Sequence, residues 1–294
     1  MTTASAATNP ATLAPVLGAR RDGSARASSS RGLLMTVLGE YVLPHSGQAW
    51  TQTIVGLMEQ LGVREKATRQ ALARMDEHGW LSRQRHGRRT RWHLTEHATA
   101  LLHAGAERIY EFGHGRSAWD EHWVVLLASV PERDRRARAR MGTGLSWAGF
   151  GSLGQGVWIS PWRDQEQAAA ALLTDLGIEG TTFVATVGQL GSGESLAAQG
   201  WDLPALAVSY HDFLKDTDPL AKGGADRAAK PDGLQAAADL ASLVDRWRRF
   251  PFLDPELPAL VLPRDWPRAV AVERFAHLRA GLGGPAREWW LARE

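Results

Sequence analysis

The sequence predicts a multidomain α+β protein, and three observations support this fold class. Three successive segments near the N-terminus carry apolar residues at helical spacing, and two short β-type runs follow them. Strand-type and helix-type segments alternate in the middle region, and the last third is mainly helical. We therefore expect a disordered tail at 1–30, a first domain at 31–112, a middle domain at 119–190 and a helical C-terminal domain at 192–294.

Composition limits the functions that are open to the chain. Its 294 residues include no cysteine, which excludes disulfides, thiolate nucleophiles and thiolate metal sites. The net charge is only +2, so any basic surface has to be local. No apolar run approaches the ~20 residues of a membrane-spanning helix, and the N-terminal pattern is not that of a secretory signal. We expect a cytoplasmic protein with no membrane partner.

The first domain has a recognisable order of elements. We expect helices at 32–43, 51–61 and 64–78, strands at 80–85 and 90–94 joined by a turn at 86–89, and a helix at 95–110. Three helices followed by a hairpin are typical of a winged helix-turn-helix, whose third helix enters the major groove of duplex DNA.

The third helix and the hairpin carry residues suited to DNA. One face of the helix is apolar or small, comprising Ala67, Thr68, Ala71, Leu72 and Met75. The opposite face carries Lys66, Arg69, Gln70 and Ala73, and these polar groups suit base edges or phosphates. The predicted DNA-binding residues are Lys66, Arg69, Gln70, Arg74, Arg83, Arg85, Arg88, Arg89 and Arg91.

The charge in this domain is locally positive. Residues 31–91 hold ten Lys or Arg against five Asp or Glu, an excess that suits phosphate neutralisation. Strand alternation sends Arg89, Arg91 and His93 to one side and Thr90 and Trp92 to the other. A solvated amphipathic helix beside a charged hairpin is the alternative, and the two signals in this order favour DNA binding.

The later regions give coarser predictions. In the middle domain we expect strands at 123–130, 156–160 and 181–187 with helices at 132–147 and 164–176, which together form a small α+β sandwich. In the C-terminal domain we expect helices at 234–249 and 270–282 and a mobile loop at 216–233. We interpret 191–195 as a linker turn.

Several other motifs are weaker. The glycines at 149–154 match G-x-G-x-x-G, but they follow a helix and precede a strand, so a glycine-rich turn is favoured over a dinucleotide site. His93 and His97 lack a matching carboxylate motif, and we predict no metal site, catalytic residue or cofactor. A basic run comprises Arg133, Arg135, Arg136, Arg138 and Arg140. A solvated face is the favoured interpretation of this run, with a phosphate ligand or a second DNA contact as alternatives.

Longer motifs resemble one known family. They are 30–42 (SRGLLMTVLGEYV), 63–75 (VREKATRQALARM), 79–81 (GWL), 123–127 (WVVLL), 147–151 (WAGFG), 156–161 (GVWISP), 249–258 (RFPFLDPELP) and 262–267 (LPRDWP). In this order they resemble the PaaX family of phenylacetate-pathway repressors, from about residue 30 to the end.

The resemblance implies a homodimeric repressor with a winged helix, a ferredoxin-like middle domain similar to small CRISPR-associated nucleases, and a helical C-terminal domain. It also implies release from double-stranded operator DNA by an aryl- or acyl-CoA thioester such as phenylacetyl-CoA. Arg64 stands where the family has Ser, which removes a side-chain cap worth ~1 kcal/mol. Thr68 stands where an aliphatic residue is expected. Both departures indicate a diverged member, so we expect its operator and its CoA ligand to differ from those of the family.

An effector site can be suggested from three tryptophans. Trp147, Trp158 and Trp162 flank the middle-domain turn, and planar rings suit an aryl thioester while Arg163 suits a phosphate. The alternative is that these rings are core or interface residues.

The sequence thus predicts a transcriptional repressor of a catabolic operon, without enzymatic activity. A metal-dependent nuclease acting through the middle domain is one alternative, but it requires an acid at the end of the first strand, and 124–129 contain none. A ligand-independent DNA-binding protein is the other.

Overall fold

The computed structural model describes residues 29–116, 118–131, 133–222 and 232–294. These residues form helices and two small antiparallel sheets, which confirms the predicted α+β class. The chain divides into two compact units. Unit 1 comprises Phe112–Tyr210 and Phe250–Ala269, and unit 2 comprises 29–111, His211–Arg249 and Val270–Glu294. Of the predicted tail, residues 1–28 lie outside the described part of the chain.

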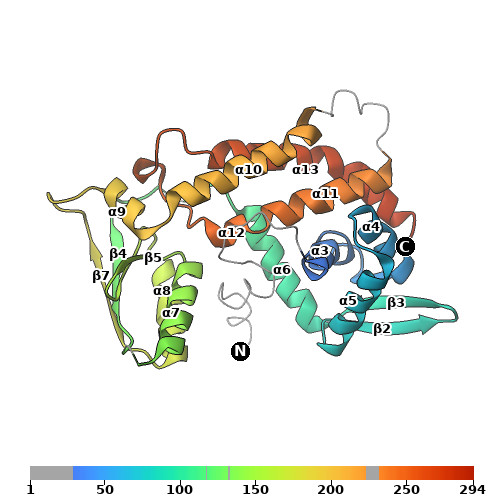
Figure 1. Ribbon diagram of the computed structural model, residues 1–294, viewed down its shortest axis with the longest axis horizontal. Helices are drawn as coiled ribbons and strands as arrows, with labels where there is room; N and C mark the ends of the chain where they lie inside the picture. The colour runs from blue at the N-terminus through green and yellow to red at the C-terminus, as the bar shows by residue number, and fades with distance from the viewer. Residues whose placement is uncertain (1–28, 117, 132, 223–231) are drawn as a thin grey trace. The chain divides into compact units, whose positions relative to one another are not determined.

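Unit 2 contains the predicted helices and hairpin of the first domain (Figure 1). Its first elements are α3 (Ser30–Val37), a π-helical turn η1 (Leu38–Val42), β1 (Gln48–Trp50), α4 (Thr51–Gln60), α5 (Glu65–Glu77), β2 (Leu81–His86), β3 (Arg89–Leu94) and α6 (Glu96–Glu111). The sheet order is β1-β3-β2, and both pairs are antiparallel. The short strand β1 was not predicted. Later helices join this unit: α11 (Gly233–Trp247), the part of α10 (Leu203–Lys222) from His211, and the part of α13 (Arg268–Leu291) from Val270.

The core of unit 2 joins residues far apart in the sequence. Helix α11 packs against α3 and α4. The ring of Tyr41 stacks on that of Trp290 at 5.1 Å, and its hydroxyl donates to the carbonyl of Ala237 at 2.8 Å. Thr36 donates to the carboxylate of Asp245 at 3.0 Å. Helices α3 and α4, on which α5 packs, are therefore held by the last part of the chain.

Unit 1 contains a four-stranded sheet with helices against it. Its elements are β4 (Trp123–Ala128), α7 (Arg135–Trp147), β5 (Gly151–Gly154), β6 (Val157–Ser160), α8 (Gln165–Leu176), β7 (Gly180–Ala185), α9 (Gly193–Gly200), α12 (Phe250–Leu253), the 3-10 helix η3 (Ala259–Val261) and the start of α10. The first six follow the chain order β-α-β-β-α-β, and the sheet order is β5-β6-β4-β7 with antiparallel pairing throughout.

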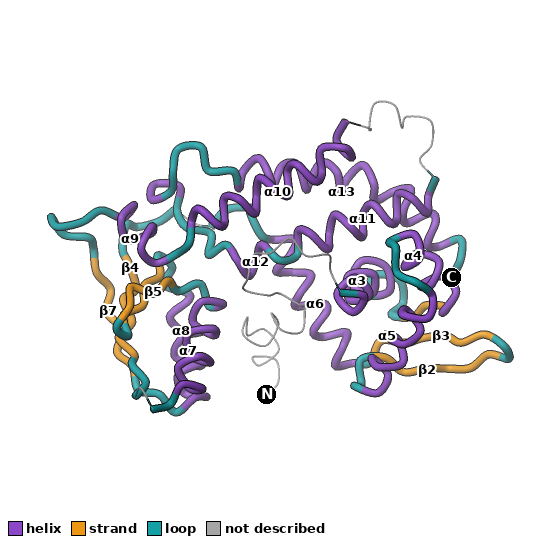
Figure 2. The backbone as a smooth tube through the Cα atoms, in the orientation of Figure 1, coloured by secondary structure: helices purple, strands orange, loops and turns teal. Residues whose placement is uncertain are grey.

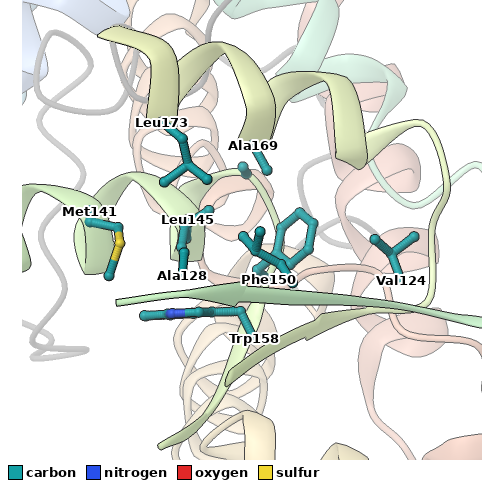
Figure 3. Packing of buried hydrophobic residues seen from close by; sticks show 10 residues of the cluster. Val124, Ala128, Met141, Leu145, Phe150, Trp158, Ala169 and Leu173 are labelled. Carbon is teal, nitrogen blue, oxygen red and sulfur yellow. The ribbon is translucent and has the colours of Figure 1, made fainter. Parts of the chain in front are cut away.

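Alternation along β4 builds two apolar layers. Val124, Leu126 and Ala128 belong to the core cluster under α7 and α8, together with Met141, Leu145, Phe150, Trp158, Ala169 and Leu173. Figure 3 shows side chains of both helices pointing toward the sheet. Trp123 lies on the other face and packs with Ala197 of α9 and with Leu257. Both faces of β4 are thus covered, as its continuous apolar run predicts.

Two glycine- or serine-rich segments were predicted wrongly as turns. Gly151–Gly154 forms the edge strand β5. Glycine is required at Gly151, because a Cβ there would lie 2.7 Å from the ring of Trp201. Ser192 is the N-cap of α9, where it forms a reciprocal capping box with Ser195.

The predicted loop at 216–233 and the predicted end of the last helix also need correction. Helix α10 continues to Lys222, and 223–231 lie outside the described residues. Ion pairs hold this end of α10, one joining Asp216 to Arg246 and another joining Asp218 to Arg274 at 2.8 Å. Helix α13 continues past Pro285 to Leu291, where the buried residues Ala286, Trp289 and Trp290 supply packing.

Candidate nucleic-acid interface

Helix α5 presents one buried and one exposed face, as predicted. Thr68, Ala71, Leu72 and Met75 are buried, and the exposed residues are Lys66, Arg69, Gln70, Ala73 and Arg74. Arg64 is the N-cap and makes no side-chain capping bond, which confirms the expected loss of the cap. Thr68 is fully buried, and its hydroxyl lies 3.5 Å from the carbonyl oxygen of Arg64. The polar face of α5 is therefore free of the domain core.

Arg69, on the exposed face of α5, forms an ion pair with a residue of its own helix. The Nε of Arg69 lies 2.7 Å from the Oε1 of Glu65, and both side chains are about half exposed, at 54% and 51%. An exposed i,i+4 pair is worth only ~0.3–0.5 kcal/mol. A phosphate or a guanine edge can therefore replace Glu65 at little cost.

The hairpin β2–β3 extends away from the helices of its unit (Figure 2). Gly87 adopts a positive φ of 60° at the turn, and Arg85 and Arg88 beside it are exposed. Arg83 pairs with Asp76 of α5 at 3.4 Å. The hairpin tip is thus an exposed pair of cations, while its base is tied to α5.

The part of the hairpin next to the turn is organised around Trp50 of β1. The guanidinium groups of Arg89 and Arg91 lie 4.0 and 4.8 Å from the centre of that ring, so both point to one side of β3 as predicted. Trp92 points the other way, is buried, and donates from its ring nitrogen to Thr51 at 2.9 Å.

A carboxylate that the sequence did not predict completes this arrangement. Glu294 accepts from the backbone N–H of Trp50 at 3.0 Å and pairs with Arg91 at 3.4 Å. Trp50 is the N-cap of α4 and makes no side-chain cap. Glu294 accepts from the N–H of this N-cap residue, as the N3 side chain does in a capping box. No local sequence pattern links Trp50 to Glu294, which lies 244 residues later. The sequence did show Trp50 directly before a predicted helix.

The histidines that were considered for a metal site have other contacts. The side chain of His93 lies 3.0 Å from the amide oxygen of Gln84, and the ring of His97 packs edge-on against Trp80. The part of the chain that the structure describes contains no group of three or more His, Asp or Glu side chains that could hold a metal ion.

The predicted effector residues do not share one environment. Trp158 belongs to the buried core under α7 and α8, and Trp147 is half-buried at the end of α7. Trp162 is buried and donates to the carbonyl of Pro255 at 3.2 Å. Arg163 is exposed and pairs with Asp120 at 2.9 Å. The pKa of Asp120 is held below its ordinary value by the backbone N–H of His122 and by Arg163.

A buried polar cluster in unit 1 was also missed. Asp254 accepts from the hydroxyl of Tyr210 and from the backbone N–H of Glu256, both at 2.6 Å, and its carboxylate lies 3.1 Å from Arg268. Burial raises the pKa of Asp254. The cluster lies in the 249–258 motif and holds α12 to α10, which assigns that motif a structural role.

Comparison with known proteins covers nearly all of the described chain. Three family models match in sequence order: PaaX-like protein at 29–98, the PaaX protein central Cas2-like domain at 116–197, and the PaaX-like protein C-terminal domain at 201–292. The chain belongs to the PaaX-like family. The region matched by the C-terminal model contributes to both compact units, whereas the first model lies within unit 2.

One relative and one solved structure show how similar the chain is to known proteins. The chain is 28% identical over 243 residues to the transcriptional repressor PaaX of Escherichia coli K12, covering 81% of this chain and 75% of that protein. It also resembles the structure of the uncharacterized protein Rv0674 from Mycobacterium tuberculosis, with a TM-score of 0.60, 25% identity, and coverage of 90% of this chain and 99% of that one. In this PaaX-like chain, no helix of the described residues is long and apolar enough to cross a membrane.

Proposed function

We propose that this protein is a winged-helix repressor that binds duplex operator DNA through α5 and the β2–β3 hairpin. The exposed polar face of α5, beside an arginine-rich hairpin in a PaaX-like chain, is the observation that carries the proposal. Lys66, Arg69 and Gln70 are suited to base edges and nearby phosphates in the major groove. The arginines of the hairpin are suited to the flanking backbone.

Substitution of Arg69 tests this proposal. Arg69→Ala is expected to weaken operator binding by about 1–3 kcal/mol, because a bidentate contact to guanine or a desolvated phosphate contact is lost. Arg287→Ala removes the same charge from an exposed position on α13 and serves as the matched control. Fluorescence anisotropy with labelled operator measures both. Equal affinity of Arg69→Ala and wild type rejects the assignment of α5.

We also propose that an aryl- or acyl-CoA thioester, such as phenylacetyl-CoA, releases the protein from the operator of a catabolic gene cluster. Membership of the PaaX-like family supports this. Arg163 is the proposed phosphate contact, since its side chain is 55% exposed and its pair with Asp120 lies at the surface. Trp147, which is half-buried, is the proposed ring contact, and the buried Trp158 and Trp162 are proposed to support the site from the core.

A competition experiment tests the effector. Bound operator is titrated with a panel of CoA thioesters and with the matching free acids. Release by one thioester but not by its acid supports the proposal, and the reciprocal test is that operator DNA weakens thioester binding by the same factor. Operator binding that no thioester changes would support a ligand-independent DNA-binding protein.

We further propose a homodimer, so that two copies of α5 read two half-sites. Sedimentation equilibrium with and without operator measures this. A monomer that binds one half-site at full affinity contradicts it.

We infer that the middle sheet is ferredoxin-like, because its β-α-β-β-α-β order and its strand order match that fold. The matching family model is described as Cas2-like, which raises nuclease activity as an alternative. Strand β4 carries only apolar residues, from Trp123 to Ala128, so the acid that would hold a catalytic metal at its end is missing. Cleavage of DNA or RNA with magnesium or manganese would instead support the nuclease alternative.

A further inference from the structure

The N-terminal part of α7 carries an exposed basic surface. Arg133, Arg135, Arg136 and Arg140 are all exposed, and we call these four the α7 arginines. Neighbouring polar groups are already engaged: Asp134 caps the helix by accepting from the N–H of Ala137 at 2.9 Å, and Arg138 donates to the carbonyl of Val130 at 3.2 Å. Within the described residues, no acidic side chain forms an ion pair with the α7 arginines.

Helical electrostatics disfavour this placement. The N-terminus of a helix carries a partial positive charge, and a cation there costs about as much as an anion gains, ~0.3–1 kcal/mol. Arg136 and Arg140 are one turn apart, so they also repel each other. The nearest acid in the described sequence, Asp134, is the N-cap of the helix, and no Asp or Glu follows it until Asp164. One acid at the start of the helix does not balance the four cations, and a bound polyanion would balance them.

Neighbouring elements do not neutralise the surface either. Helix α8 packs beside α7 over the shared core, and its first acid, Glu166, is hydrogen-bonded to Thr182 of β7. The acids near the other end of α8, Asp175 and Glu179, form no ion pair with the α7 arginines within the described residues. Met141 and Leu145 hold the inner side of α7 against the sheet. The arginines are thus presented on a rigid helix, which reduces the entropy cost of ordering them on a ligand.

We propose that the α7 arginines bind backbone phosphates of duplex DNA, as a sequence-independent contact in addition to that of unit 2. The proposal rests on the proposed DNA-binding function. Each residue adds ~1.5 Å along a helix, so Arg136 and Arg140 lie about 6 Å apart along the axis and can take two phosphates of one strand. Arginine suits this role because its planar fork matches phosphate oxygens. A CoA thioester also carries a diphosphate and a phosphate, so the outcomes below distinguish it from DNA.

The salt dependence of binding tests the proposal. The variant Arg136→Ala/Arg140→Ala and the full-length wild type are titrated with operator and with unrelated duplex from low to high salt. Loss of two phosphate contacts is expected to reduce the slope of log K against log salt by about 1.8, since each contact contributes ~0.9. The preference for operator over unrelated duplex is expected to stay the same, because phosphate contacts carry no sequence information.

Two controls separate charge from position and from folding. Arg264→Ala/Arg287→Ala removes the same charge from exposed positions elsewhere and is expected to leave the slope unchanged. Arg136→Lys/Arg140→Lys keeps the charges and is expected to keep the slope. Melting curves should show that Arg136→Ala/Arg140→Ala is at least as stable as wild type, because it removes a repulsive pair.

The outcomes are distinct. If Arg136→Ala/Arg140→Ala has the same salt slope as Arg264→Ala/Arg287→Ala and the wild type binds operator, this inference is wrong and the proposed function stands. An unchanged slope with impaired release by a CoA thioester also overturns it and assigns the arginines to the effector. A loss confined to RNA binding overturns it in favour of RNA. A wild type that binds no duplex contradicts the proposed function and this inference together.

Discussion

Replacing Glu294 by Gln should loosen the start of α4. Glu294 is 9% exposed, accepts from the N–H of Trp50 and pairs with Arg91, which is 21% exposed. A charged acceptor stabilises a hydrogen bond by ~1 kcal/mol more than a neutral one. An anion at a helix N-terminus adds ~0.3–1 kcal/mol, and Arg91 loses its counter-charge. We expect a total loss of about 2 kcal/mol.

Amide hydrogen exchange measures this loss at the position where it arises. If opening becomes about 2 kcal/mol easier, exchange at Trp50 and the first turn of α4 speeds up by roughly 30-fold, since 1.4 kcal/mol is a factor of ten. Glu288→Gln removes the same charge from an exposed position on α13 and should leave that exchange unchanged. Equal exchange in Glu294→Gln and Glu288→Gln would refute the reasoning, because Glu294 would then not act as the cap.

Three further changes test the two cores. Gly151→Ala should destabilise unit 1 by ~1–3 kcal/mol in denaturant unfolding, because its Cβ would overlap the ring of Trp201. A stable Gly151→Ala protein would contradict the close approach. Tyr41→Phe should cost ~1–1.5 kcal/mol in thermal unfolding, since the buried carbonyl of Ala237 loses its donor. No change would mean that the bond is not formed. Burial raises the pKa of Asp254, so the folded state binds the proton more tightly than the unfolded state, and stability should fall as pH rises from about 3.9 through the raised pKa. Asp254→Asn should remove this fall, which urea unfolding across the pH range measures, and an unchanged profile would exclude Asp254 as its source.

Local patterns predicted the elements of the candidate site well. The faces of α5 followed from the spacing of Thr68, Leu72 and Met75, because helical periodicity directly encodes burial. The side to which Arg89 and Arg91 point followed from strand alternation in the same way. In both cases the information lies within one turn or one strand.

Features that depend on distant partners could not be predicted. Gly151 reads as a turn residue until the ring of Trp201 is placed against it. Asp216 and Asp218 read as loop residues until Arg246 and Arg274 pair with them and extend α10. Glu294 carries no local sign of its contact with Trp50. Such contacts depend on which segments fold next to one another, which no single segment encodes.

The packing of Trp290 on Tyr41 has a consequence for biosynthesis. The two residues are 249 positions apart, and a ribosome adds ~5–20 residues per second. Roughly 12–50 s therefore pass between the synthesis of Tyr41 and that of Trp290. During this interval the ring of Tyr41, in η1, lacks the ring that stacks on it in the folded protein. The packing of unit 2, which carries the surface that we propose to bind DNA, is therefore completed only after Trp290 has been synthesised.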